Sequence, residues 1–351
     1  MGASDRELTV DGEGLLAELA RWRRSKAPAL PARWWLSFGA APLLLLAVQG
    51  VTGVLLALHY HPSAAEAYRS TQAISEQLSY GWFLRGLHRW AATLMIATAL
   101  LHQLRVLLTG AYQAPRRATW LFGWLALLGA VAACFTGEFL TGQHRGVQAL
   151  LVGVELSAEV PGVGPALRRL LLGGAGLGEA TWPRIYAVHG ILLPGLIAAL
   201  AAVHLVWVRR WGSAATQTAA PGGGGAGFGP SQLGLDLCVG LGWLLLVTVL
   251  ATVDAGTLSP SAAAAGSAEP VRAHWYALPL VRWVRLVPAS VAAWTLYLAV
   301  AIVAAWPWLE TRLFDGRLGA SVGLAGRGRA AAAGVAALVL GLGIWEAVSG
   351  P

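Results

Sequence analysis

Four histidines stand in apolar stretches of the sequence, at spacings that could place them in pairs. His88 and His102 lie 14 residues apart in "LRGLHRWAATLMIATALLHQLR" (84–105), and His189 and His204 lie 15 residues apart in "AVHGILLPGLIAALAAVHLVWVRR" (187–210). Along an α-helix, 14 residues return to within about 40° of the starting direction and 15 residues to within about 60°. Each stretch is therefore predicted to present two histidines on roughly one face, separated by a rise of about 21–23 Å.

The chemistry that such pairs could perform is the ligation of a haem iron. Two neutral imidazoles that face each other across a gap supply both axial ligands of a six-coordinate haem. If both helices run in the same direction, His88 lies at the depth of His189, and His102 at the depth of His204. A single histidine in an apolar helix is more readily explained by a hydrogen bond to a neighbour. Four histidines at matched depths favour two ligand pairs, one above the other.

Glycines repeat the same 14-residue period in two neighbouring stretches. The pairs are Gly39 with Gly53, and Gly123 with Gly137. A glycine allows a flat macrocycle to approach the backbone closely. Small residues also mediate helix–helix packing in membranes, which is the alternative explanation for one such pair. Two pairs that share the histidine period indicate haem edges lying between four helices.

Three arginines near the ends of the histidine stretches could neutralise haem propionates. They are Arg85, Arg105 and Arg184. Guanidinium groups form strong hydrogen bonds with carboxylates, but arginines also anchor the ends of membrane helices, so both explanations stay open here. Cys134 and Cys238 lie in apolar runs without a C-x-x-C-H pattern. The sequence therefore predicts neither a disulfide nor a covalently attached c-type haem.

The elements that must position these residues are predicted to be membrane-spanning helices. The chain of 351 residues is 56% hydrophobic and 12% charged, with a mean hydropathy of +0.60. That charged fraction is too small to cover the surface of a soluble domain. Seven stretches are long and apolar enough to cross a bilayer: 38–58, 87–109, 119–140, 185–208, 234–253, 288–306 and 330–347. The predicted fold is an all-α, polytopic membrane helix bundle.

The distribution of charge predicts how the bundle is oriented. Most arginines and lysines lie in the N-terminal tail and in the connections after the second, fourth and sixth apolar stretches. The positive-inside rule places these segments in the cytoplasm, for a multi-pass protein of a bacterial inner membrane. The net charge of +8 is accordingly attributed to lipid-facing loops, with no nucleic-acid partner. Within the tail, "GLLAELARWRR" is expected to form an amphipathic helix on the membrane surface.

Composition divides the chain into four predicted segments. Residues 1–37 form the tail with its surface helix, and residues 38–212 form a four-helix di-haem domain. Residues 213–233 contain "TAAPGGGGAGFGPS", whose composition is typical of a flexible linker. Residues 234–351 form a three-helix C-terminal part.

The sequence resembles cytochrome b of the quinol–cytochrome c/plastocyanin oxidoreductases, the complexes that contain a Rieske iron–sulfur protein. The resemblance runs from about residue 30 to residue 350. It rests on "VQGVTGVLLALHYHPSAAEAYRSTQAI", "YGWFLRGLHRW", "LLTGAYQAPRRATWLFGW", "ATWPRIYAVHGILLP", "HWYALPLVRWVRLVP" and "WPWLE". The 15-residue step between His189 and His204 is similar to the chloroplast and cyanobacterial type. The two halves of the chain then correspond to that type's cytochrome b and subunit IV, here fused.

The resemblance implies a role for each histidine and for two further residues. His88 and His189 would ligate an outer, low-potential haem of b type, and His102 and His204 an inner, high-potential one, both non-covalently. A quinol-oxidising pocket is expected on the outer side and a quinone-reducing pocket on the inner side. Arg209 and Asp236 match residues beside the inner pocket of the chloroplast type.

The sequence departs from the pattern of the family at three places. Ser37 stands where the chloroplast type has the cysteine that holds an extra covalent haem, so no such haem is expected. "AHWY" replaces the Pro-Glu-Trp-Tyr motif of the outer pocket, with His274 in the place of the glutamate and Tyr276 retained. At the end of the third apolar stretch, Glu138 replaces the tyrosine of the family's Gly-Tyr-x-Leu-Pro, and Thr141 replaces its proline. One hypothesis is that His274 and Glu138 form a pair that accepts the quinol proton, with Glu138 orienting His274 or sharing its proton. The alternative is two independent, solvated residues.

Two functions follow from these expectations. In the first, the chain is the membrane core of a Rieske-type complex, a dimeric multi-subunit assembly with an iron–sulfur protein and a c-type cytochrome, and it carries electrons between quinol and quinone. In the second, it is a two-haem electron conduit for another redox partner, without bifurcated quinol oxidation. A haem-free channel or scaffold would leave the matched histidines without an explanation.

Overall fold

The computed structural model describes residues 39–160, 162–211, 228–263, 273–313 and 327–349. Within these residues the regular structure is helical, apart from one isolated antiparallel bridge between Gln143 and Ser261. The predicted all-α fold is therefore confirmed. The amphipathic helix expected in the N-terminal tail, and Ser37, lie outside the described residues.

Each of the seven apolar stretches forms a helix. These helices are α3 (Ala41–Ala57), α5 (Gly81–Thr109), α6 (Arg117–Leu140), α10 (Leu193–Trp211), α12 (Phe228–Val253), α14 (Ala289–Leu313) and α16 (Arg327–Ser349). α9 (Thr181–Ala187) runs into α10 through a π-helical turn, η1 (Val188–Leu192). Shorter helices connect them: α4 (Ala67–Glu76), α7 (His144–Ala158), α8 (Gly164–Leu172) and α13 (Leu278–Leu286).

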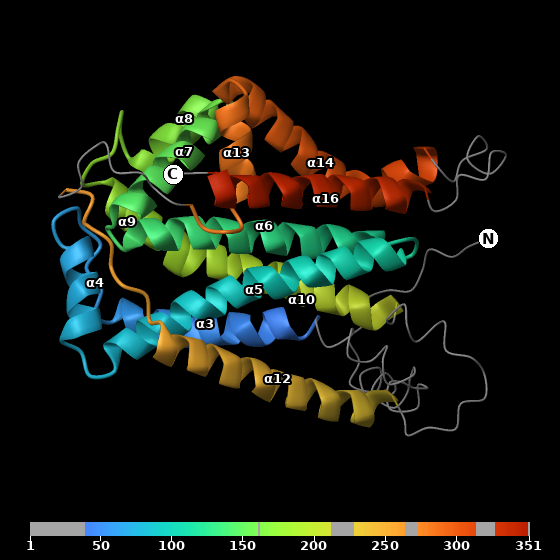
Figure 1. The fold of residues 1–351 in the computed structure, drawn as a ribbon, viewed down its shortest axis with the longest axis horizontal. Coiled ribbons are helices and arrows are strands. Elements are labelled where there is room, and N and C mark those ends of the chain that lie inside the picture. Colours follow the sequence, from blue (N-terminus) through green and yellow to red (C-terminus); the bar gives the residue numbers. More distant parts are fainter. Residues whose placement is uncertain (1–38, 161, 212–227, 264–272, 314–326, 350–351) are drawn as a thin grey trace, which may run out of the picture.

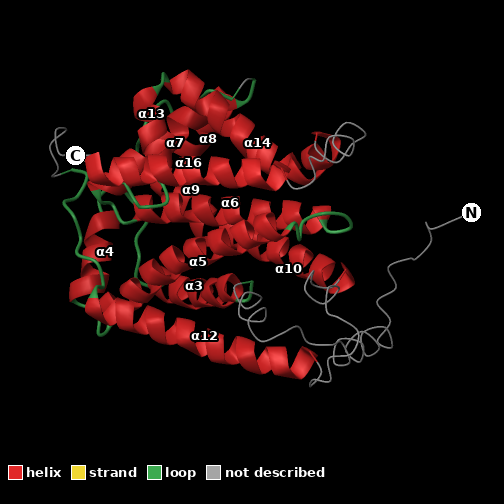
Figure 2. Ribbon diagram, turned by 45° about the vertical axis from the view of Figure 1, so that its right-hand side comes forward, coloured by secondary structure: helices red, strands yellow, loops and turns green. Residues whose placement is uncertain are grey.

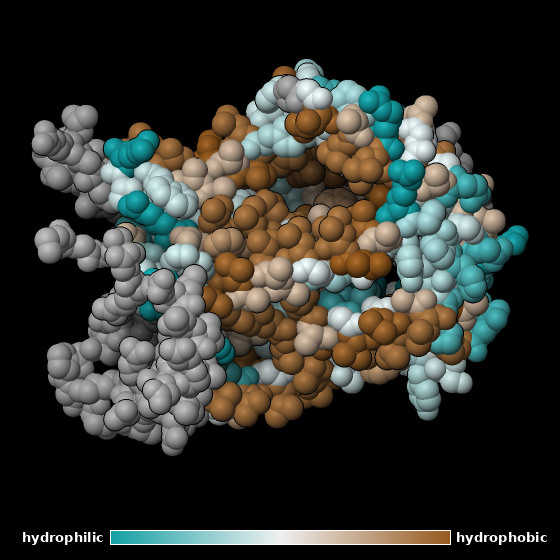
Figure 3. Space-filling view, turned by 180° about the vertical axis from the view of Figure 1, so that it is seen from behind, coloured by the Kyte–Doolittle hydropathy of each residue, from teal (hydrophilic) through white to brown (hydrophobic). Residues whose placement is uncertain are grey.

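The surface of the molecule is that of an integral membrane protein. Among the described residues, five helical segments are long and apolar enough to span a bilayer: 81–109, 117–140, 181–211, 233–253 and 289–313. α3 and residues 333–348 are shorter apolar helices. Large apolar side chains such as Val54, Ile191 and Leu241 are exposed. Figure 3 shows one face of the molecule, on which hydrophobic residues form a belt across the middle and hydrophilic residues lie toward the ends.

Four helices form the central bundle, and the C-terminal helices pack on its two sides (Figures 1 and 2). α3 packs against α5, and α10 packs against α6. α12 lies along α5 and α3, whereas α14 packs against α6 and α7. α12 begins at Phe228, inside the segment 213–233 whose composition is typical of a linker. Below, the "α4 end" is the end of the bundle at which α4, α7 and α9 lie, and the other end is the "opposite end".

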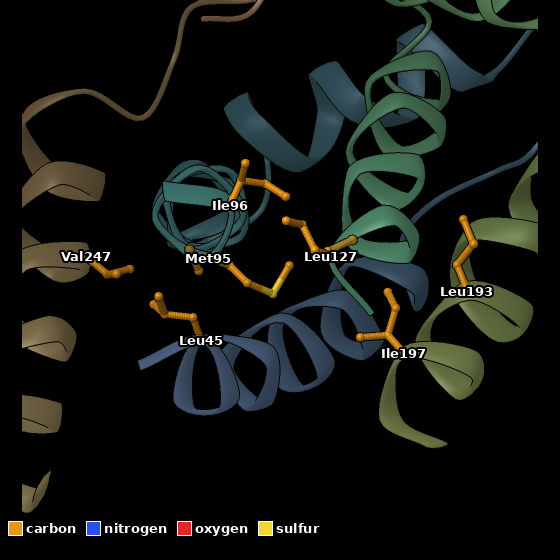
Figure 4. Packing of buried hydrophobic residues seen from close by; sticks show 9 residues of the cluster. Leu45, Met95, Ile96, Leu127, Leu193, Ile197 and Val247 are labelled. Atoms are coloured by element: carbon orange, nitrogen blue, oxygen red, sulfur yellow. The ribbon is translucent and has the colours of Figure 1, made fainter. Parts of the chain in front are cut away.

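The core of the bundle lies halfway between its two ends. Leu45, Met95, Leu127 and Ile197 meet there from α3, α5, α6 and α10 (Figure 4). Met95 stands seven residues from both His88 and His102, which is about two helical turns in either direction. A layer of apolar side chains therefore separates the levels of the two histidine pairs.

Candidate functional site

The four histidines form two facing pairs between α5 and the α9–α10 segment. The ring centroids of His88 and His189 are 6.3 Å apart, with an angle of 71° between the ring planes. Those of His102 and His204 are 6.4 Å apart, with an angle of 76°. The first pair lies toward the α4 end of the bundle and the second toward the opposite end. The structure thus brings together the partners that the sequence spacing suggested.

The separation within each pair fits one metal ion bound between two imidazoles. A metal–imidazole bond measures about 2.0 Å, and a ring nitrogen lies about 1.1 Å from the ring centre, so two rings on opposite sides of an ion have centres about 6 Å apart. Both observed separations agree with this value. The residues present therefore fit a haem iron with two axial histidines.

Hydrogen bonds fix the tautomer of His88. Thr52 Oγ1 lies 2.8 Å from His88 Nδ1 and also donates to the carbonyl of Val48 at 2.7 Å. Because its one proton is used on that carbonyl, the hydroxyl oxygen accepts from Nδ1–H. The lone pair of His88 is then on Nε2, the nitrogen that is free to bind a metal.

The two histidines of the α9–α10 segment are held in the same tautomer. His189 Nδ1 lies 3.0 Å from the carbonyl of Ala133 and 3.1 Å from Thr136 Oγ1. His204 Nδ1 lies 2.8 Å from the carbonyl of Thr119. A carbonyl only accepts, so Nδ1 is the donor in both rings and Nε2 carries the lone pair. His102 differs, since its Nδ1 has no hydrogen-bond partner among the described residues.

The π-helical turn explains how a 15-residue step matches a 14-residue step. His189 lies in η1, between α9 and α10. Pro194, just beyond this turn, has no N–H with which to continue the regular α-helical ladder. A π turn holds one more residue than an α turn. The extra residue is absorbed there, so that His204 keeps the face on which His189 lies.

Three of the four periodic glycines touch the histidines. A Cβ atom would lie close to a ring Cε1 at each: 3.3 Å from His88 at Gly53, 3.0 Å from His204 at Gly123 and 2.7 Å from His189 at Gly137. At Gly137 the contact is shorter than real Cβ atoms show. Gly39 lies half-buried, two residues before α3. The glycines thus make room for the imidazoles.

The predicted propionate partners lie at the expected ends of the bundle. Arg85, at the α4 end, donates from Nε to Ser75 Oγ at 2.8 Å and from Nη2 to the carbonyl of Gly256. Arg184, also at this end, donates to the carbonyl of Leu170 at 3.1 Å. Arg105 lies at the opposite end, three residues after His102. Arg85 thus connects α5 to α4 and to the loop at Gly256, and Arg184 connects α9 to α8.

A cavity at the opposite end contains one of the two residues expected beside the inner pocket. It lies between the start of α3 and residues 233–244 of α12, and it is lined by Ala41, Leu44, Asp236 and Leu237, among others. Its walls are largely apolar, with the carboxyl group of Asp236 as a polar group. Arg209 is exposed on the last turn of α10, at the same end of the bundle, but does not line the cavity.

A cluster of polar side chains lies at the α4 end, where α6 meets α7. Glu138 is on the last turn of α6, and its Oε2 lies 3.0 Å from His274 Nε2. Arg145, on the first turn of α7, donates to Glu138 Oε1 from Nη2 at 2.6 Å and from Nε at 2.8 Å. The ring of Tyr276 stacks on that of His274, with centroids 5.4 Å apart. The structure brings Glu138, His274 and Tyr276 together, and it adds Arg145, which the sequence analysis missed.

The turn between α6 and α7 places the side chain of Arg145 against that of Glu138. Gly142 has a φ of +70°, and an added Cβ there would lie 2.7 Å from the backbone nitrogen of Tyr68. At Gly146 an added Cβ would lie 2.1 Å from the carbonyl oxygen of Glu138. Only glycine fits either position. The close packing of α7 on the end of α6 therefore depends on both.

Comparison with known proteins identifies the family. The family model described as Cytochrome b/b6/petB matches residues 24–212. Cytochrome b6 from Synechococcus elongatus is 36% identical over 174 residues, which cover 50% of this chain and 81% of that protein. Cytochrome b6 from Chlamydomonas reinhardtii is 36% identical over 165 residues, covering 47% of this chain and 77% of that protein. The chain belongs to the cytochrome b/b6 family.

A solved structure extends the likeness over almost the whole chain. The chain is similar to one described as "Hyperthermophilic respiratory Complex III", with a TM-score of 0.72 and 19% identity, over 95% of this chain and 94% of that one. At this identity the likeness shows the fold, including the C-terminal half that the family model does not match. The resemblance to a fused cytochrome b and subunit IV is consistent with this fold.

Family membership settles the general character of this cytochrome b. It is an integral, multi-pass membrane protein of electron transfer, it binds haem of b type, and it is a subunit of a quinol–cytochrome c type oxidoreductase. The paired histidines with their Nε2 lone pairs fit that cofactor.

Proposed function

We propose that this chain holds two non-covalent b-type haems and carries electrons across the membrane between quinol and quinone. The observation that carries the proposal is the pair of matched histidine separations, 6.3 Å at the α4 end and 6.4 Å at the opposite end. His88 and His189 would hold one haem, and His102 and His204 the other. When bound, the haems supply one-electron transfer along the membrane normal.

The protein's own part is to orient the ligands and to keep the bundle apolar between them. Thr52 and the carbonyls of Ala133 and Thr119 hold three imidazoles with Nε2 available. Gly53, Gly123 and Gly137 leave room where a Cβ would crowd a ring. Arg85, Arg105 and Arg184 are the candidate partners of the propionates, and Gly39 is the candidate fourth close-approach glycine.

A quinone-reducing site is proposed at the opposite end. Its candidate is the cavity between α3 and α12, because an apolar pocket with few polar groups suits a quinone ring. Asp236 supplies a carboxyl group there, and Arg209 adds a positive charge at the same end of the bundle.

A quinol-oxidising site is proposed at the α4 end, with His274, Glu138 and Tyr276 as its catalytic residues. His274 stands where the family has a glutamate, and its 3.0 Å contact with Glu138 supports a working pair over two independent residues. Oxidation of a quinol releases two protons, and a nearby base is needed to receive them.

The chain is proposed to act in a larger assembly with a fixed orientation in the membrane. The partners are a Rieske iron–sulfur protein and a c-type cytochrome in a dimeric multi-subunit complex. The charge distribution supports a cytoplasmic N-terminus in a bacterial inner membrane, with the α4 end facing outward. Residues 38–212 would form the di-haem domain, and residues 234–351 would complete the quinol pocket.

A second candidate is a two-haem conduit for another redox partner, without bifurcated quinol oxidation. The observation in its favour is that "AHWY" replaces the acidic motif of the outer pocket. The conduit hypothesis predicts haem reduction by that partner but not by quinol. A gene for a Rieske protein beside this one would favour the first candidate.

The test is a cofactor count followed by a quinol assay. Pyridine haemochrome analysis of the purified chain is expected to give two b-type haems, and haem staining after denaturing electrophoresis is expected to be negative. With the iron–sulfur partner present, a quinol is expected to reduce the haem of His88 and His189. One haem per chain would overturn the haem assignment. Two haems without quinol-driven reduction would favour the conduit.

A further inference from the structure

Glu138 has both carboxylate oxygens engaged, each by a different partner. Oε1 accepts two hydrogen bonds from Arg145, at 2.6 and 2.8 Å, and Oε2 faces His274 Nε2 at 3.0 Å. The side chain is 14% exposed, whereas that of Arg145 is 35% exposed. A carboxylate that is paired with a guanidinium and hydrogen-bonded through both oxygens is stabilised in its ionised form. It is therefore a poor acceptor for a further proton.

The ionised carboxylate determines the tautomer of His274. A carboxylate only accepts hydrogen bonds, so Nε2 carries the proton and Nδ1 carries the lone pair. Nδ1 has no hydrogen-bond partner among the described residues. The ring is held parallel to that of Tyr276, at an angle of 4°, and Tyr276 packs edge-on against Phe135. The imidazole is thus fixed in one orientation, with one basic nitrogen available.

We propose that His274 Nδ1 accepts a hydroxyl proton of the quinol, and that Glu138 and Arg145 are positioning residues that hold and tune this imidazole. The inference rests on the proposed quinol-oxidising site. Of the two roles considered for Glu138, orienting His274 or sharing its proton, it selects the first. The arrangement is a carboxylate–histidine pair in which the carboxylate itself is compensated by an arginine.

The proton step is balanced as follows. The O–H bond of one quinol hydroxyl breaks, an N–H bond forms at Nδ1, and the neutral imidazole becomes an imidazolium. One electron leaves to the iron–sulfur partner and the other to the second one-electron acceptor of the proposed function, and the proton of the other hydroxyl goes to water. The imidazolium is stabilised by Glu138 across the 3.0 Å contact and later releases its proton to water.

The other titratable groups around the ring do not compete for this proton. Burial is the largest of the causes that raise the pKa of the Tyr276 phenol above its ordinary value, so the phenol stays protonated. The Cys134 thiol, on α6, lies beside that phenol. Arg145 on α7 and Arg85 on α5 are the positive charges that act on Glu138. Among these described groups, His274 Nδ1 is the acceptor whose lone pair is open to a quinol hydroxyl.

The rate of quinol oxidation is expected to fall at low pH, where the imidazole is already protonated; this fall is the acid limb of the pH profile. Two substitutions are expected to move the acid limb in opposite directions. Glu138→Gln leaves Arg145 uncompensated, which disfavours the imidazolium and moves the limb to lower pH. Arg145→Gln leaves Glu138 uncompensated, which favours the imidazolium and moves the limb to higher pH. Each shift is expected to be about 1 pH unit, and the double variant is expected to return close to the parent. His274→Ala is expected to lose about 100-fold or more in rate, together with the limb.

The experiment measures quinol oxidation by the assembled complex between pH 5 and pH 9, with rates normalised to b-type haem absorbance. The matched control is Arg168→Gln, because Arg168 makes a 3.1 Å ion pair with Glu155 at the same end of the molecule; it is expected to keep the parent limb. Glu138→Asp is a second variant that keeps the charge, and it is expected to lower the rate without moving the limb.

The outcomes separate this inference from the function on which it rests. If the parent turns over and Glu138→Gln is as inactive as His274→Ala, Glu138 itself takes the proton and the inference is wrong. Limbs that stay in place in both Glu138→Gln and Arg145→Gln would also overturn it. A parent complex without quinol-driven turnover would instead overturn the proposed outer site, and this inference with it.

Discussion

An added Cβ on Gly137 would lie 2.7 Å from Cε1 of His189, across the interface of α6 and η1. The observed orientation of the His189 imidazole therefore requires a glycine at position 137. The contact links a residue without a side chain to a proposed ligand 52 positions later in the chain.

Gly137→Ala is accordingly expected to displace His189 and to abolish the haem at the α4 end. The haem at the opposite end should persist, because His102 and His204 do not contact this glycine. Haem content and reduced-minus-oxidised spectra measure the effect. Gly153→Ala is the matched control, since an added Cβ there has no heavy atom within 4 Å. Two haems retained in the Gly137 variant would show that the helices can separate to admit the methyl group.

Substitution of single histidines should remove the haems pair by pair. His88→Ala and His189→Ala are expected to lose the same haem, and His102→Ala and His204→Ala the other, because each iron needs both of its axial ligands. Redox titration of the haem absorbance identifies which one remains. His61→Ala, at an exposed position, is expected to keep both. Loss of different haems from the two members of one pair would contradict the pairing.

The sequence predicted the helices and the histidine pairs because both follow from periodicity. All seven apolar stretches form helices, and, with α9 to α10 taken as one segment, their bounds move by at most seven residues, as in α14, which ends at Leu313 instead of 306. The matched depths of His88 and His189 follow from the parallel direction of their helices. Periodicity is a local property, so it can be read without knowledge of the tertiary fold.

Contacts between distant segments could not be predicted in this way. The backbone at Val188–Leu192 forms π-helical and not α-helical hydrogen bonds, and composition alone does not determine which of the two forms. Arg145 reaches Glu138 only because Gly142 and Gly146 reverse the chain there. The position of α12 on the far side of the bundle from α14 depends on which apolar faces meet. Helices that are apolar all round carry little information about their neighbours.

Thr52→Val is expected to weaken the hold on the haem of His88. The hydroxyl accepts the Nδ1 proton at 2.8 Å, and loss of such a bond to a ligand histidine costs about 10-fold or more in metal affinity. Without this hydrogen bond the imidazole would donate less electron density to the iron and would stabilise the oxidised haem less. The reduction potential of that haem is therefore expected to rise, by about 59 mV for each tenfold loss of affinity for the oxidised form.

The control for this variant is Thr98→Val, also on a buried site. Among the described residues, Thr98 Oγ1 donates to the carbonyls of Leu94 and Met95, both in its own helix. Redox titration should leave both potentials unchanged in this control. An unchanged potential in Thr52→Val would mean that the hydroxyl does not act on the ligand.

Asp254 gives a pH dependence of stability at the α4 end. A hydrogen bond from Arg89, at 2.7 Å, is the main cause that lowers the pKa of this carboxyl in the folded protein. Because the folded-state pKa lies below that of the unfolded chain, the stabilisation is present above about pH 4 and is lost as the pH falls through the folded-state value. Asp254→Asn is expected to lower the unfolding temperature at pH 7 and to match the parent at the lowest pH reached. A difference between the two proteins that does not change with pH would contradict this assignment.

Glu346 is expected to hold the last helix, α16, against α13, the helix that follows His274. It is 5% exposed, and its oxygens lie 2.6 Å from Arg285 Nη1 and 3.6 Å from Arg282 Nη1, while Arg282 also covers the ring of Trp345. Both arginines are on α13, which begins two residues after Tyr276. Glu346→Gln leaves their charges uncompensated, at a cost of about 1–3 kcal/mol, since Arg285 is partly solvated. Differential scanning calorimetry should show a lower unfolding temperature, with slower quinol oxidation but full haem content.

Glu66→Gln is the control, because it removes an exposed pair with Arg69. It should change neither the unfolding temperature nor the rate of quinol oxidation. An equal loss in both variants would show that the buried position of Glu346 is immaterial.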